Sequence, residues 1–259
     1  MARDLKFFYF GYQCPHNAYL LARIKTIAWQ ESVRLHLFDI TNDEETCRRF
    51  SIFSPTMTIV NEKYRLHGPF TREKIVAMLE DEDTAPRGYR VNQSDEVVRG
   101  ELVPITPESV LQTCGPCINS EDQGLCRGKS EWVSEMLKGT GLQNLGYLHF
   151  YDGRCVGGAE FLPSKRVPYP IQDKSDGNVF LTCSFISDER LDYRTHPLER
   201  LIDDLASGGM STLSVAASED VVFPNGPVEW FTKKGFVDKG MLAEEKLHEA
   251  RVHYLQLQL

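Results

Sequence analysis

The cysteines are the residues whose type and spacing most directly suggest chemistry. Cys114 and Cys117 enclose two residues in the letters Cys-Gly-Pro-Cys, and Cys126 follows just ahead of a helical pattern. Three soft ligands on one loop have the spacing of a zinc or iron–sulfur site, which Cys155, Cys183 or a histidine would complete. Two other interpretations stay open: the thiols exchange with a second thiol-bearing unit, or the segment is a cysteine-containing loop without a ligand.

Cys14 is a second candidate, because it lies where a strand gives way to a helix. The apolar run from Leu5 to Tyr12 predicts a strand buried on both faces, and the residues from His16 to Gln30 repeat at helical spacing. The chain has seven cysteines, an odd number, so full disulfide pairing is excluded. In a reducing compartment they are thiols, metal ligands or core residues.

The elements that would position Cys14 occupy residues 5–82. Their pattern predicts a strand, a helix, a strand, a short helix, two strands and a last helix. This order resembles the thioredoxin fold, and the resemblance rests on Cys14–Asn17 at a strand-to-helix turn and on Ser54 and Pro55 before the third strand. It implies a Cys14 thiolate that is stabilised by the helix dipole and faced by a cis proline, Pro55.

Asn17 departs from that family, because a disulfide oxidoreductase has its second cysteine there. Without a resolving thiol in place, the unit cannot cycle a local dithiol and disulfide by itself. The resemblance therefore implies a monothiol at Cys14, with Cys47 as a distant partner. The alternative is a buried Cys14 in a domain that serves for docking.

The second part of the chain carries a more specific pattern. An Asp152-Gly153 pair between two apolar runs predicts a hairpin over 145–162. The elements predicted after it are a strand at 179–186, a helix at 197–206, a strand at 213–216, a helix at 228–234 and a strand at 251–257. The chain is therefore expected to be α/β, with a mixed sheet and helices on its faces.

This order resembles the GNAT N-acetyltransferases. The resemblance rests on residues 152–157 (Asp-Gly-Arg-Cys-Val-Gly) and 230–236 (Trp-Phe-Thr-Lys-Lys-Gly-Phe), and covers roughly the last 120 residues. With its cysteine-bearing segment upstream, the chain also resembles the YoaP-like subgroup. We expect a thioredoxin-like domain at 1–84, a linker and cysteine-rich segment at 85–127, and a GNAT-like domain at 128–259.

The GNAT resemblance implies an acetyl-CoA site at the start of a helix, where backbone N–H groups of a Gly-rich loop hold the pyrophosphate. The positions that match it are Ile186, Arg194, Thr195 and His196. Two neighbouring residues depart from the family pattern. Pro197 removes an N–H donor where a glycine is expected, and Glu199 adds a carboxylate near the phosphates.

The resemblance also implies a proton donor for the leaving thiolate of CoA and a base for the acceptor amine. Phe231 stands where many members have a tyrosine, so Cys183 or Tyr193 would have to substitute. Glu160 is the candidate base, and the alternative is a solvent-facing strand residue. Three further residues match the expected substrate cleft, with ordinary surface positions as the alternative: His149, Asp188 and Glu189.

Composition limits the partners. The 259 residues carry a formal net charge of −8, which argues against broad binding to nucleic acid or anionic membranes. The N-terminal segment is too short and too aromatic for a signal sequence, and no run of residues is long enough for a membrane helix. We expect a cytoplasmic protein whose partner is a small-molecule substrate or another protein.

Three functions follow from these patterns. The first is a GNAT-like acyltransferase that acts on an amine or a thiol-containing substrate, with weak or absent CoA turnover because of Pro197, Glu199 and Phe231. The second is a protein that is not a transferase and binds zinc or an iron–sulfur cluster through Cys114 and its neighbours. The third is a monothiol redox protein that uses Cys14.

Overall fold

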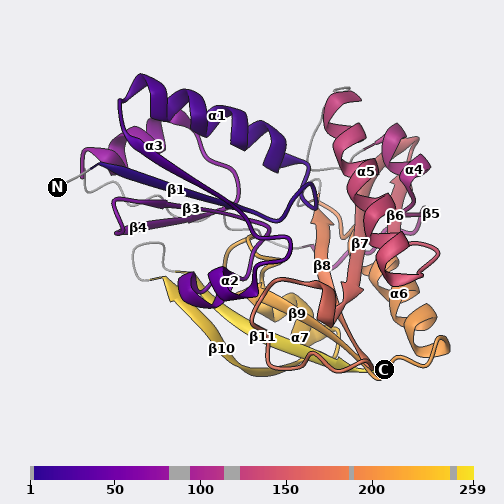
Figure 1. Ribbon diagram of the computed structural model, residues 1–259. Coiled ribbons are helices and arrows are strands. Elements are labelled where there is room, and N and C mark those ends of the chain that lie inside the picture. Colours follow the sequence, from indigo (N-terminus) through magenta and orange to yellow (C-terminus); the bar gives the residue numbers. More distant parts are fainter. Residues whose placement is uncertain (1–2, 82–93, 114–122, 187–189, 246–249) are drawn as a thin grey trace.

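The computed structural model describes residues 3–81, 94–113, 123–186, 190–245 and 250–259. Their strands form two mixed sheets, one from each part of the chain, and the helices pack against them (Figure 1). Within these residues no helix is long and apolar enough to cross a bilayer.

The first sheet has the strand order β2-β1-β3-β4. Strands β1 and β2 are parallel, whereas β3 is antiparallel to β1 and β4 is antiparallel to β3. Its elements are β1 Asp4–Tyr9, α1 His16–Gln30, β2 Arg34–Asp39, α2 Glu44–Phe50, β3 Thr56–Val60, β4 Tyr64–His67 and α3 Arg72–Leu79. The predicted order of elements in this part of the chain is confirmed.

Strand β1 contributes apolar side chains to two different cores, one on each of its faces. Phe7 packs with Leu20 of α1 in one buried cluster, and Phe8 and Phe10 belong to another. In a strand, neighbouring side chains point to opposite faces. The polar residues of β1, Asp4 and Lys6, lie in its first half and pair with each other at 2.6 Å. Helices α1 and α3 lie along one face of the sheet (Figure 1).

The second sheet has seven strands in the order β10-β11-β9-β8-β7-β6-β5. Its elements are β5 Glu101–Pro104, α4 Pro107–Gln112, α5 Gln123–Thr140, β6 Gly146–Tyr151, β7 Arg154–Pro163, the short helix η1 Ser164–Arg166, β8 Asn178–Ile186, α6 Thr195–Ser207, β9 Thr212–Ser218, α7 Val228–Lys233, β10 Val237–Glu245 and β11 Ala250–Gln258. The predicted hairpin is confirmed: Asp152 and Gly153 form its turn with φ of 51° and 70°.

Strands β8 and β9 separate soon after they begin. They are parallel and pair only from Asn178 to Phe180. Beyond Phe180, β8 continues to Ile186, and β9 continues beside β11. The sheet therefore opens along one side of β8.

Two elements differ from the sequence-based expectation. The edge strand β10 was not predicted, because its sequence is rich in charged residues, and its Val237 and Met241 are exposed, as is common at a sheet edge. The second difference lies around two prolines, where no helix was expected. Pro104 ends the edge strand β5, and Pro107 opens α4 behind the capping residue Thr106. Both elements fall within the segment 85–127.

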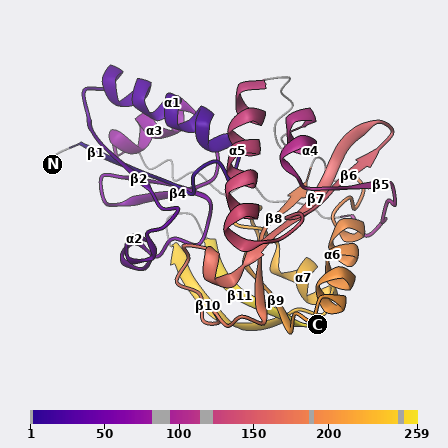
Figure 2. The ribbon, with the colours of Figure 1, turned by 45° about the vertical axis from the view of Figure 1, so that its right-hand side comes forward.

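The two sheets share one buried cluster. Phe10, the residue after β1, makes edge-on ring contacts with Trp132 of α5, at a centroid distance of 5.7 Å, and with Tyr169, at 6.0 Å. Helix α5 contacts α1 and lies between the two sheets (Figure 2). Residues from both parts of the chain therefore bury each other at the junction between the two sheets. A pocket at this junction is lined by residues of both parts.

Candidate functional site

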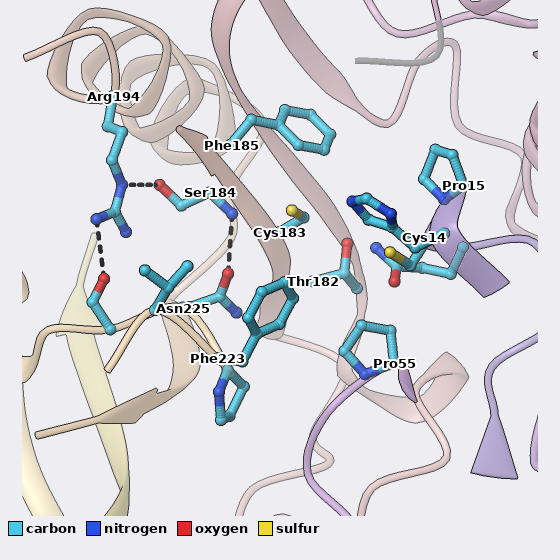
Figure 3. A pocket seen from close by; sticks show the side chains of 15 residues that line it. Cys14, Pro15, Pro55, Thr182, Cys183, Ser184, Phe185, Arg194, Phe223 and Asn225 are labelled. Atoms are coloured by element: carbon cyan, nitrogen blue, oxygen red, sulfur yellow. Dashed lines mark hydrogen bonds between the residues drawn. The ribbon is translucent and has the colours of Figure 1, made fainter. Parts of the chain in front are cut away.

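A pocket lies at the junction, beside the opening of the second sheet (Figure 3). It encloses about 660 Å³ outside the protein atoms, part of which is open solvent. It is lined by Gln13, Cys14, Pro15, His16, Pro55, Thr182, Cys183, Ser184, Phe185, Arg194, Val222, Phe223, Pro224, Asn225 and Gly226. Three residues predicted for three different roles, Cys14, Cys183 and Arg194, therefore line one cavity.

The first wall of the pocket comes from the turn between β1 and α1. Cys14 is partly exposed and precedes Pro15, the N-cap of α1, and Pro55 lines the same cavity. The expected cis peptide at Pro55 is wrong: within the described residues the cis bonds precede Pro224 and Pro227. Pro55 thus shares the cavity with the thiol in the ordinary trans geometry.

The second wall comes from β8, where the strand has parted from β9. Cys183 is partly exposed and lies opposite Glu160 of β7 in the sheet register. The next residue, Ser184, donates its backbone N–H to the side-chain oxygen of Asn225, at 2.9 Å. The loop between β9 and α7 thereby replaces a neighbouring strand on this side of β8.

Glu160 lies behind the pocket wall and is fully buried, so the alternative of a solvent-facing residue is wrong. Its carboxylate is 2.5 Å from the ammonium of Lys129, which is also buried. Gln13 and Thr182 donate hydrogen bonds to its Oε1 at 2.7 and 2.8 Å. Both of these donors line the pocket, so the ion pair supports both walls. A role of Glu160 as a base stays a prediction.

The start of α6 is occupied by a carboxylate of the chain itself. Asp192 accepts the backbone N–H groups of Arg194 and Thr195, both at 2.9 Å, and the Thr195 hydroxyl at 2.5 Å. It is 1% exposed. Since Pro197 has no N–H, few backbone donors of the first turn are left for a phosphate.

Arg194 is buried although it lines the pocket. Its guanidinium donates to the Ser184 hydroxyl at 2.9 Å and to the Gly226 carbonyl at 3.0 Å, and stacks over Trp230 at 4.1 Å. Arg194 thus ties β8, α6 and the loop before α7 together (Figure 3). Ile186, the other position matched to the cofactor site, is the last residue of β8, and the structure describes its backbone but not its side chain.

His149 and His196 lie side by side, with ring centroids 5.3 Å apart. His149 is fully buried, so its interpretation as a surface residue is wrong. Its Nε2 accepts the N–H of Gly100, so its Nδ1 donates to the carbonyl of Tyr193, at 2.9 Å. Burial lowers the pKa of both imidazoles below the usual 6.5.

The remaining GNAT-like positions point away from the pocket or lie outside the described residues. Phe231 is fully buried against Trp230 and Phe236 and does not line the cavity. Glu199 is exposed, and its carboxylate pairs with Arg99 at 2.7 Å. Asp188 and Glu189 belong to the segments that the structure does not describe.

The predicted metal ligands are not brought together in the described residues. Cys114 and Cys117 fall outside them, and Cys126 is buried in α5. Residues 3–81, 94–113, 123–186, 190–245 and 250–259 contain no group of three histidine, cysteine or carboxylate side chains that could hold a metal ion. Zinc and iron–sulfur binding therefore gain no support.

A second, larger cavity lies on the other side of the turn before α1. It encloses about 1210 Å³ outside the protein atoms, part of which is open solvent, and four carboxylates line it: Asp39, Asp43, Glu131 and Glu135. Polyanions are repelled by such a lining. Of the two cavities, the first is therefore the better candidate for a CoA thioester.

Three residues were missed from the sequence: Asn225, which lines the first pocket, and Lys129 and Asp192, which hold residues of its walls. Asp192 had a local signal, because an aspartate just ahead of a helix commonly accepts backbone N–H groups of its first turn. Lys129 had no local signal, since it lies in a polar stretch of α5 and its partner, Glu160, lies in β7.

Solved structures of acetyltransferases are similar to part of this chain. The N-acetyltransferase from Staphylococcus aureus Mu50 shares 13% identity, with 62% of this chain and 99% of that chain covered and a TM-score of 0.45. Ard1 from Thermoplasma volcanium shares 12% identity, with 62% of this chain and 99% of that chain covered and a TM-score of 0.41. The ribosomal-protein-alanine N-acetyltransferase from Brucella melitensis shares 14% identity, with 61% of this chain and 99% of that chain covered and a TM-score of 0.42. The sequence matches no protein-family model and no curated protein.

Proposed function

We propose that the second sheet and its helices form a GNAT-like acyltransferase domain whose acyl-CoA site is weak. The observation that carries this proposal is the seven-stranded order with β8 and β9 paired over only three residue pairs. The opening beside β8 places residues 182–185 of the strand in the wall of a pocket, along which an extended acyl-pantetheine arm would lie. The resemblance in the sequence motifs at 152–157 and 230–236 points to the same class of protein.

The site suits the two parts of acyl-CoA differently. Pro15, Pro55 and Phe223 give the pocket an apolar lining that suits an uncharged thioester arm. The phosphates fit poorly, because Asp192 already occupies the N–H groups at the start of α6 and adds a negative charge. We therefore expect side chains, rather than backbone N–H groups, to hold the phosphates of CoA.

We also propose that the first sheet is a thioredoxin-like unit that presents a substrate to this pocket. The support is the strand order β2-β1-β3-β4 together with Cys14 at the turn before α1. Its thiol and Pro55 lie in the wall opposite β8. The acceptor would be an amine or a thiol-containing molecule.

Calorimetric titration with acetyl-CoA tests the acyltransferase proposal. We expect saturable binding with a Kd of about 0.1 to 1 mM, equivalent to about 4 to 5.5 kcal/mol. A short thioester without phosphates, S-acetyl-N-acetylcysteamine, should bind within a few-fold of acetyl-CoA. Micromolar affinity would contradict the weak site, and no binding at several millimolar would retire the acyltransferase proposal.

Lys234 provides a sharper test, because its ammonium lies next to Asp192 at the start of α6. Its ammonium is 4.0 Å from Asp192 and partly exposed. Lys234→Ala should weaken acetyl-CoA binding several-fold and leave the phosphate-free thioester unchanged. Lys165→Ala is the matched control, because Lys165 is exposed, pairs with Asp176 and does not line the pocket. Equal losses for both variants would show that only overall charge matters.

A further inference from the structure

The pocket contains a thiol from each of its two walls. We propose that Cys14 and Cys183 act together as a dithiol–disulfide pair that spans the two sheets and exchanges with a small, uncharged organic disulfide. Neither residue is in a disulfide in this structure. The proposal goes beyond acyl transfer and does not depend on whether acyl-CoA binds.

Cys183 would supply what the first unit lacks. The position where a second cysteine would follow Cys14 is Asn17, whose amide donates to the carbonyls of Gly11 and Pro55 at 2.9 and 3.1 Å. That turn of α1 therefore offers an amide where a resolving thiol would stand. Across the cavity, Cys183 is partly exposed on β8, where the strand has lost its neighbour (Figure 3). The resolving thiol thus comes from the other sheet.

Tyr169 lies in the core that the two sheets share and does not line the pocket. Its ring packs between Phe10 and Phe180, one from each sheet, at centroid distances of 6.0 and 5.6 Å. Its hydroxyl is buried and has no hydrogen-bond partner among the described residues. Burial raises its pKa well above 10, and the nearby Cys47, Cys14 and Cys183 add to this effect, so the phenol keeps its proton.

The exchange balances without any further reactant. The Cys14 thiolate attacks one sulfur of the disulfide RSSR, the S–S bond breaks, and the first thiolate leaves and takes up a proton as RSH. Cys183 then loses its proton and attacks the sulfur of Cys14, so the second RSH leaves and the Cys14–Cys183 bond forms. The two protein thiols are oxidised by two electrons, and the substrate disulfide is reduced to two thiols.

The order of attack follows from position. Cys14 lies just before α1, a helix of fifteen residues without an acidic side chain in its first turn, and a helix start favours a thiolate. Cys183 lies in the middle of a strand. Of the residues that line the pocket, Arg194 is the one with a permanent charge, and it is already held by Ser184 and Gly226. Uncharged substituents on the disulfide therefore suit this cavity.

The test uses the full chain, first reduced and then treated with bis(2-hydroxyethyl) disulfide, followed by intact-mass and peptide analysis. The native protein should lose two hydrogens and yield a peptide pair that links Cys14 to Cys183. Cys183→Ser should instead keep one mercaptoethanol on Cys14, with a lifetime about tenfold longer than in the native protein. Cys14→Ser should form neither product.

Cys155→Ser is the matched control, because Cys155 is also partly exposed but does not line the pocket, and it should behave as the native protein. Thermal unfolding of each variant shows whether it is folded, and Cys183→Ala provides a second variant at that position. A linkage of Cys14 to any other cysteine would overturn the proposal. A stable mixed disulfide in the native protein would also overturn it, because it would show that Cys183 does not reach Cys14. A disulfide between them needs Cα atoms about 4.4 to 6.8 Å apart.

Discussion

Lys129 and Glu160 form a buried ion pair between α5 and β7, with 2.5 Å between Nζ and Oε2. The ammonium also contacts the ring face of Trp132, at 4.3 Å, and donates to the backbone carbonyl of Gln13. Gln13 belongs to the first part of the chain and the other three residues to the second. The pair therefore fixes the turn that carries Cys14 against the strand that faces Cys183.

Removing one partner of this pair should be costly, since it leaves a buried charge without compensation. Lys129→Met and Glu160→Gln should each lower the free energy of unfolding by about 3 to 5 kcal/mol. The double variant should lose less than the sum of the two, because neither charge is then left alone. Urea unfolding of the four proteins measures this, and additive losses would mean that the pair is not coupled in solution.

Stability should fall as the pH decreases through about 6.5. His149 is buried and its folded-state pKa is lowered, so the unfolded chain binds a proton more readily than the folded chain. The free energy of unfolding therefore begins to fall below the unfolded-state pKa, and it continues to fall until the pH reaches the folded-state pKa. Melting temperatures between pH 8 and pH 5 measure it. His149→Gln should flatten the curve more than His196→Gln, and an unchanged curve for both would contradict this assignment.

Cys47 should be unreactive in the folded protein. It is completely buried, and burial raises the pKa of its thiol to about 12. Iodoacetamide at pH 8 should modify Cys14 and Cys183 at least tenfold faster than Cys47, because the thiolate is the reactive species. Peptide mass spectrometry gives the rates, and denaturant should remove the difference. Rapid modification of Cys47 without denaturant would show that the shared core opens.

Gly226 has no room for a side chain. A Cβ built there would lie 1.7 Å from the carbonyl oxygen of Val221. Gly226→Ala should therefore lower the free energy of unfolding by about 1 to 3 kcal/mol and displace the loop that binds Arg194 and Ser184. Gly139→Ala in α5 is the matched control, because its nearest contact is the flexible end of Arg166. Similar melting temperatures for the two variants would contradict the packing of this loop.

The sequence predicted the elements better than the site. Periodicity located the strands of the first sheet and the hairpin at Asp152, because burial on one or two faces leaves a local pattern. The edge strand β10 was missed, since an exposed edge has no such pattern. Cys14 and Cys183 were both singled out, but no local signal indicates that residues 169 positions apart line one pocket. Burial of Glu160 was likewise invisible, because its compensating charge lies on a different element.

Asp192 has a consequence for any anion that approaches α6. A carboxylate attached to the chain is present at a local concentration that a dissolved ligand does not reach, so the helix start is permanently self-ligated. An incoming phosphate would have to displace this internal ligand and leave its buried charge near Trp230 and Lys234. Regaining tight phosphate binding would therefore take at least two changes, the loss of the carboxylate and the return of a backbone donor at Pro197.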